Sequence, residues 1–147
     1  QEKLKLIRKQ GCYTGSRKNY RGKHSVSGIG FESGAIAVAH AVHNGLTALE
    51  ETHHYYHSEK VSFGVVTQLV LENAGDDGIK EVIEFCKDVV ATTLSDLGIT
   101  DITREKLMKV AVLACAEGET IHNMPFEVSP DSVYSAMVVA DKLGKTY

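Results

Sequence analysis

Histidines whose spacing suits metal chemistry are concentrated in one stretch of the sequence. Five of the seven histidines lie between His40 and His57. His40 and His43 are three residues apart and would share one face of a helix, and His57 directly precedes a second predicted helix. Imidazole is the usual protein ligand for zinc and related divalent cations. The spacing therefore indicates a metal site between two neighbouring helices, with His53 and His54 in the turn that joins them.

The same spacing has a structural explanation. Paired histidines on a helix are often solvated or hydrogen-bonded side chains, and no specific metal motif such as HExxH accompanies these. A catalytic zinc needs three protein ligands and an open position, whereas the spacing supplies two. The histidine pattern by itself leaves both interpretations open.

Other chemistry is weakly indicated. The glycines of 28–34 follow no predicted strand, so they are no dinucleotide fingerprint and we predict no cofactor-binding residue. Cys86 and Cys115 fall on apolar helix faces, which favours a place in the core. The three cysteines form neither a CxxC pair nor a disulfide framework, so we expect a reducing, cytoplasmic location.

The elements that would position these residues are helical. Apolar periodicity predicts five helices and no strand, an all-α domain, over 34–49, 58–74, 79–90, 103–116 and 130–143. The expected N-caps are Ser33, Ser58, Thr103 and Ser129, and Gly144 is expected to end the last helix. Hydrophobic residues make up 43% of the chain, enough for a packed core. No apolar run approaches the length of a bilayer span, so we expect no membrane partner.

Charge is distributed unevenly along the 147 residues. Residues 1–25 hold eight Lys/Arg and one Glu, a net charge of +7, whereas the remaining 122 residues carry −10. A basic head of this kind indicates a tail that binds nucleic acid or a membrane. No predicted helix or aromatic platform accompanies these charges, so we rank nucleic-acid binding last and expect no such partner.

Four longer motifs carry a resemblance to a known family. They read GIGFESG, AHAVHNGLT, HSEKVSFG and AEGETIHNMPF, over Gly28–Gly34, Ala39–Thr47, His57–Gly64 and Ala116–Phe126. They closely resemble the glycerol dehydrogenases of the iron-containing (group III) alcohol/polyol dehydrogenase family. The resemblance extends over Ser27–Tyr147, and Ser58 departs from it, since the family usually has glycine there.

The resemblance implies a fold and a set of site residues. It implies a helical bundle like the C-terminal metal-binding domain of the family, whose α/β nucleotide-binding domain this sequence does not contain. His40 and His57 are implied to ligate Zn²⁺ or another divalent metal, together with an aspartate from a segment that the sequence lacks. His43 is implied to be a catalytic residue and Phe31 to lie near the substrate.

The resemblance also implies a reaction. Family members use NAD to oxidise glycerol, and related small polyols, to products such as dihydroxyacetone. We expect this chain to be a truncated C-terminal domain, inactive alone, that forms a homo-oligomer through the surface left uncovered. The alternative is a non-catalytic helical module for metal binding or oligomerisation.

Residues 1–26 do not follow the family. Where this chain has Cys12–Ser25, the family has a peptide close to VTPALEKIIEANT. Codons for Cys12–Ser25, read one nucleotide later, can encode that peptide in order. We therefore hypothesise that 1–26 is a basic aberrant segment, translated out of frame at least from Cys12, and that 27–147 is the helical dehydrogenase domain. A divergent natural loop is the alternative, and the sequence of the encoding gene distinguishes the two.

Overall fold

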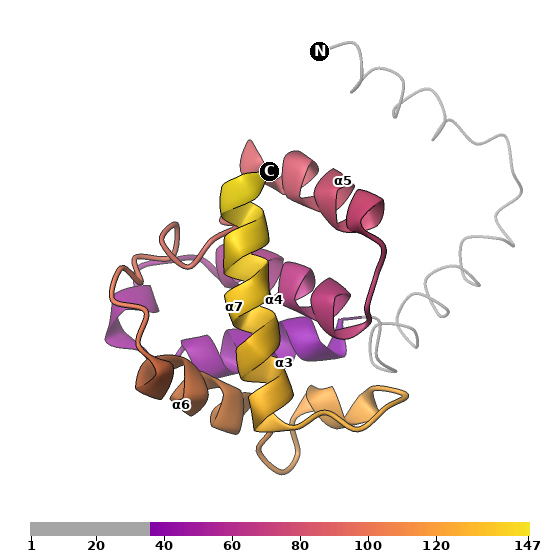
Figure 1. Cartoon of the computed structure of the whole chain (residues 1–147). Coiled ribbons are helices and arrows are strands. Elements are labelled where there is room, and N and C mark those ends of the chain that lie inside the picture. The colour runs from indigo at the N-terminus through magenta and orange to yellow at the C-terminus, as the bar shows by residue number, and fades with distance from the viewer. Residues whose placement is uncertain (1–35) are drawn as a thin grey trace, which may run out of the picture. The chain divides into compact units, whose positions relative to one another are not determined.

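The computed structural model describes residues 36–147 (Figure 1). Segment 1–26, Ser33 and Phe31 lie outside the described residues. Within 36–147 the chain forms helices and no strand, which confirms the predicted all-α class. The five α-helices and two 3₁₀ helices are α3 (Ala37–Leu46), η2 (Glu50–Thr52), α4 (His57–Leu71), α5 (Asp76–Lys87), α6 (Arg104–Ala114), η3 (Thr120–Asn123) and α7 (Pro130–Thr146).

Four of the helices enclose the core. Helix α3 contacts α4 and α6, and α7 contacts the same two helices, while α5 packs against α4. Figure 1 shows α7 running across α4. The fully buried side chains include Phe63, Leu107 and Met137, one each from α4, α6 and α7. Burial of such side chains contributes about 1.5–3 kcal/mol each to the stability of the fold.

Two helix starts agree with the predicted caps. The Thr103 hydroxyl accepts the Lys106 backbone N–H at the start of α6. The Ser129 hydroxyl accepts the Ser132 N–H at 3.2 Å, and Pro130 is the first residue of α7. These hydroxyls satisfy amides that have no partner within the helix.

The predicted cap at Ser58 is wrong. Helix α4 begins one residue earlier, at His57, with Tyr56 as its N-cap. The Glu59 carboxylate accepts the Tyr56 backbone N–H at 2.7 Å, so the first turn is closed by the glutamate. This shift places His57 inside the helix rather than before it.

The predicted helix end at Gly144 is also wrong. Helix α7 continues to Thr146. A Cβ added at Gly144 would lie 2.5 Å from the Thr92 carbonyl oxygen. Glycine is needed there because the loop after α5 approaches the α7 backbone closely, and not because the helix stops.

The loop between α5 and α6 is held to α7 by a buried carboxylate. Asp141, 6% exposed, accepts the Leu94 backbone N–H at 2.9 Å and the Lys145 ammonium at 2.6 Å. Gly98, with φ of 75°, ends the turn in this loop. Across 36–147, none of the helices is both long and apolar enough to cross a membrane.

Candidate metal and catalytic site

Helices α3 and α4 bring three histidines together. His40 and His43 lie one turn apart on α3, and His57 is the first residue of α4. The ring centroids of His40 and His57 are 5.5 Å apart, and those of His43 and His57 are 4.2 Å apart. The candidate residues therefore form one cluster, although His57 is separated from His43 by fourteen positions.

A close helix crossing makes this cluster possible. A Cβ added at Gly64 of α4 would lie 2.5 Å from the carbonyl oxygen of Ala39, the residue before His40. The Gln68 side-chain oxygen accepts the Ala39 backbone N–H at 3.3 Å. Glycine thus lets the two backbones meet at His40, and the glutamine amide fixes their register.

Hydrogen bonds continue from the histidines to a second loop. Nδ1 of His57 lies 3.0 Å from Nε2 of His43, whose Nδ1 lies 3.0 Å from Oδ1 of Asn44. The Asn44 amide donates to Glu119 Oε2 at 2.9 Å. Separately, His40 Nδ1 lies 3.3 Å from the Ile36 carbonyl oxygen. Each of the three rings is therefore oriented through Nδ1.

The surroundings of His43 favour its neutral form. Burial lowers the pKa of His43 by desolvating the imidazolium, and the hydrogen bond to Asn44 partly opposes this. Positive charge on His57, Lys60 or His40 lowers the pKa of His43 further. Lys60 is itself buried, and its ammonium donates to the Thr52 carbonyl at 3.3 Å.

The donor set and spacing fit two ligands of one divalent ion. With Zn–N bonds of about 2.0–2.1 Å, two imidazoles on a tetrahedral ion have ring centroids roughly 5 Å apart, which is close to the 5.5 Å between His40 and His57. Ligating histidines commonly donate the other ring N–H to a carbonyl, as Nδ1 of His40 can to Ile36. Among residues 36–147, however, no group of three His, Cys, Asp or Glu is arranged to hold a metal.

The remaining described histidines make loop contacts. Nε2 of His53 lies 3.0 Å from the Thr47 carbonyl oxygen, and Nε2 of His122 lies 3.0 Å from that of Ala116. His54 is exposed. Asn44 and Glu119 were not predicted as site residues from the sequence. They are 75 residues apart, and the only signal was that both lie inside motifs shared with the family.

The two cysteines within 36–147 show no sign of activation. Cys86 and Cys115 are free. Both are only partly buried, whereas the sequence predicted a place in the core. Burial raises the pKa of both thiols. A raised pKa lowers the thiolate fraction, which disfavours a nucleophilic role.

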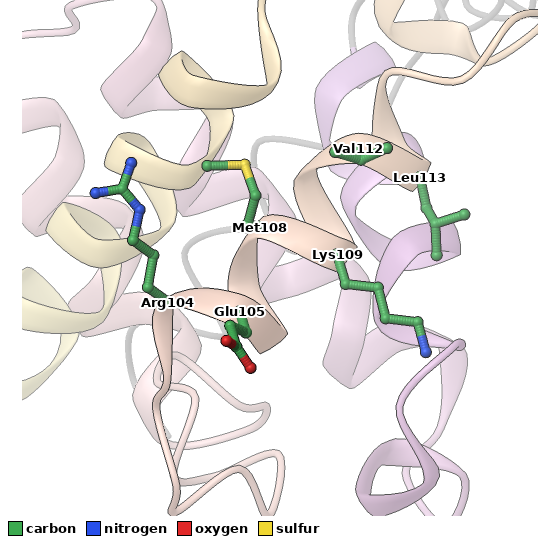
Figure 2. A pocket seen from close by; sticks show the side chains of 6 residues that line it. All are labelled: Arg104, Glu105, Met108, Lys109, Val112 and Leu113. Carbon is green, nitrogen blue, oxygen red and sulfur yellow. The ribbon is translucent and has the colours of Figure 1, made fainter.

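The outer face of α6 carries a separate depression. Figure 2 shows Met108, Val112 and Leu113 along this face with charged side chains beside them. Val112 is 52% exposed and Leu113 is 39% exposed. The lining contains no histidine, so this apolar surface is distinct from the cluster on α3 and α4.

Comparison with known proteins finds similarity to the enzymes that the motifs resemble. The chain is 56% identical over 123 residues to a glycerol dehydrogenase of Pseudomonas putida, a match covering 83% of this chain and 34% of that protein. It is 49% identical over 121 residues to a glycerol dehydrogenase of Thermotoga maritima, covering 82% and 33%. The chain thus spans about a third of the length of these relatives. No protein-family model matches it.

Solved structures give the same result. A probable glycerol dehydrogenase from Sinorhizobium meliloti 1021 matches with a TM-score of 0.73 and 39% identity, covering 76% of this chain and 32% of that one. A glycerol dehydrogenase from Schizosaccharomyces pombe matches with a TM-score of 0.72 and 34% identity, covering 75% and 28%. The helical fold therefore matches the helical C-terminal domain of these enzymes.

Proposed function

Because this chain is homologous to the glycerol dehydrogenases over 83% of its length, we propose that it is the helical metal-binding part of an NAD-dependent glycerol dehydrogenase. The observation that carries this proposal is the pairing of His40 and His57 across α3 and α4, with ring centroids 5.5 Å apart. Zn²⁺ or another divalent cation is the proposed ligand of this pair.

In this proposal the two imidazoles hold the cation from one side, with Nε2 of each ring as the ligating atom. A divalent ion bound there would supply Lewis acidity, which lowers the pKa of the glycerol hydroxyl that is oxidised. His43 lies beside His57 and orients its ring through the contact of 3.0 Å between Nε2 of His43 and Nδ1 of His57. His57 and Lys60 both lie in the first turn of α4.

Two histidines are an incomplete set for a catalytic zinc, which requires three protein ligands. The chain also matches only 34% of the length of the Pseudomonas putida enzyme. We therefore propose that oxidation of glycerol needs the part of the relatives that this chain does not match, and that the chain by itself has no activity.

Titration of the full chain with Zn²⁺ or Co²⁺ tests the metal site. His40→Ala and His57→Ala are each expected to weaken binding by about tenfold or more. His122→Ala is the matched control, because the His122 ring contacts the Ala116 carbonyl instead. Binding by His40→Ala and His57→Ala that equals the parent's would contradict the proposal.

A complementation assay tests the enzymatic part. The chain is mixed with the N-terminal two thirds of a glycerol dehydrogenase, and formation of NADH from NAD is followed with and without glycerol. Glycerol-dependent NADH that requires both pieces and is lost in His57→Ala supports the dehydrogenase function. Metal binding without any activity of the mixture favours the non-catalytic metal-binding module.

Self-association is a second proposed property. The apolar face of α6 has Val112 and Leu113 exposed, with Arg104, Glu105 and Lys109 around them. Side chains of both charge signs beside an apolar strip allow two copies of one surface to pair across a two-fold axis. We therefore propose a homo-oligomer that uses this face.

A further inference from the structure

The hydrogen bonds that link α3 to the loop after α6 have a fixed direction. A carboxylate has no proton to donate, so Glu119 must accept, and the end of Asn44 facing it at 2.9 Å must be the amide NH₂. The other end of Asn44 is then its carbonyl oxygen, Oδ1, 3.0 Å from Nδ1 of His43.

This assignment determines the proton positions on two imidazoles. Oδ1 of Asn44 can only accept, so Nδ1 of His43 carries the hydrogen and Nε2 of the neutral His43 ring carries a lone pair. That lone pair faces Nδ1 of His57 at 3.0 Å, so Nδ1 of His57 is the donor. Nε2 of His57 is thereby left with its lone pair, which is the form in which an imidazole binds a cation.

We propose that Glu119 and Asn44 are positioning residues that act through His43 to set the tautomer and orientation of His57 for metal binding. The proposal rests on the proposed function, since it assumes that His57 is a ligand. It also gives His43 a definite role. Both ring nitrogens of His43 are engaged, by Asn44 and by His57, so in this arrangement His43 orients a ligand.

The geometry explains why these two residues act together. Asn44 is exposed on α3, and an exposed amide could turn over and present its NH₂ to His43. Glu119, at the N-cap of η3, prevents this because only the NH₂ end of Asn44 can donate to it. The carboxylate therefore decides which way the amide points, and it acts on the two imidazoles through Asn44.

The decisive experiment measures tautomers and metal affinity on the full chain. Two-bond ¹H–¹⁵N correlation spectra of the imidazoles, assigned with single histidine variants, distinguish Nδ1–H from Nε2–H rings at a pH where they are neutral. In the parent chain His43 and His57 are both expected as Nδ1–H. Asn44→Leu, which keeps helix propensity at an exposed position, should move them toward Nε2–H and weaken Zn²⁺ binding about 10- to 100-fold.

Three further variants separate positioning from general disturbance. Asn44→Asp keeps an oxygen that accepts from Nδ1 of His43, so it should retain the parent tautomers. Glu119→Ala frees the amide to turn and should weaken Zn²⁺ binding, whereas Glu117→Ala, which removes a carboxylate from the same loop, should not. Circular dichroism confirms that each variant remains helical.

The outcomes are distinguishable. If Asn44→Leu leaves both tautomers and the Zn²⁺ affinity unchanged while His57→Ala weakens binding, the positioning role is overturned and the metal site stands. If His57→Ala itself has no effect on Zn²⁺ affinity, the proposed function fails, and the claim that Nδ1 of His57 donates to His43 is then decided by the spectra alone.

Discussion

Individual side chains in this domain owe their chemistry to neighbours that are distant in sequence. His43 is an example: its pKa is lowered first by burial and then by charges on α4, while Asn44 opposes the shift. The resemblance implied roles for His40, His43 and His57 because these residues lie in two family motifs, Ala39–Thr47 and His57–Gly64. Glu119 also lies in a family motif, but its link to Asn44 could not be predicted because that link exists only after η3 has packed against α3.

The thiols give a prediction at this scale. Burial raises the pKa of Cys86 and Cys115, so at pH 8 both should react with iodoacetamide several-fold more slowly than free cysteine, because less thiolate is present. Rates are measured by mass spectrometry in a Cys12→Ser background. The reaction should accelerate as the pH rises toward the raised pKa values and on unfolding in urea. Alkylation as fast as that of free cysteine in the native chain would contradict the prediction.

At the scale of helices, local sequence signals predict where a helix begins better than where it ends. The hydroxyls of Thr103 and Ser129 cap α6 and α7 as expected because capping is a local interaction. Gly144 was wrongly expected to end α7 because its role is tertiary: it faces the Thr92 carbonyl across a helix–loop contact. For the third helix, the predicted range of 79–90 is displaced by three residues toward the C-terminus at both ends, since α5 spans Asp76–Lys87.

The α3–α4 crossing can be tested through its glycine. Gly64→Ala places a Cβ against the Ala39 carbonyl, and such overpacking costs about 1–3 kcal/mol. The free energy of unfolding in urea should fall by that amount, and Zn²⁺ affinity should fall as well because His40 and His57 move apart. Gly78→Ala on α5, where a Cβ meets nothing within 4 Å, should instead stabilise by about 0.5–1 kcal/mol. Equal effects of the two substitutions would exclude the crossing as the cause.

The link between α7 and the loop that joins α5 to α6 gives a second test. Asp141→Ala leaves the buried Leu94 N–H without its acceptor, a loss that costs about 1–3 kcal/mol. Lys145→Ala removes only a half-exposed ammonium from the same carboxylate and should cost less than about 1 kcal/mol. Urea unfolding of both variants measures the difference. A larger loss for Lys145→Ala than for Asp141→Ala would show that the ion pair, and not the backbone contact, holds the loop.

At the scale of the whole molecule, the all-α class follows from apolar periodicity. The family was indicated by the longer motifs, because the histidine spacing alone left a metal site and a structural role both open. The helix contacts α3–α4, α3–α6, α4–α7 and α6–α7 could not be predicted from the sequence because amphipathic faces specify burial but not partners. The hypothesis that 1–26 is translated out of frame stays a prediction, and the sequence of the encoding gene tests it.

Self-association is tested at this scale. Val112→Asp puts a charge in the exposed apolar strip of α6, where Val112 is 52% exposed, so it should lower the oligomeric mass without lowering helicity. Light scattering after size exclusion measures the mass of parent and variant at several concentrations. Val89→Asp is the matched control, since Val89 is 76% exposed and lies outside α6, two residues after the end of α5. An unchanged mass for Val112→Asp would remove α6 from the interface.

The close approaches at Gly45, Gly64 and Gly144, where an added Cβ would lie 2.5 Å from the carbonyl oxygens of Val110, Ala39 and Thr92, predict a pattern of mutational tolerance. A saturation library sorted for soluble, folded protein should be depleted of nearly every replacement at these three positions. The same library should accept many residues at His43 and His57, which are only partly buried or exposed. A second sort of the survivors for metal retention should then deplete replacements at His43 and His57. The two selections would separate the glycines that allow the helices to approach from the histidines that depend on this approach.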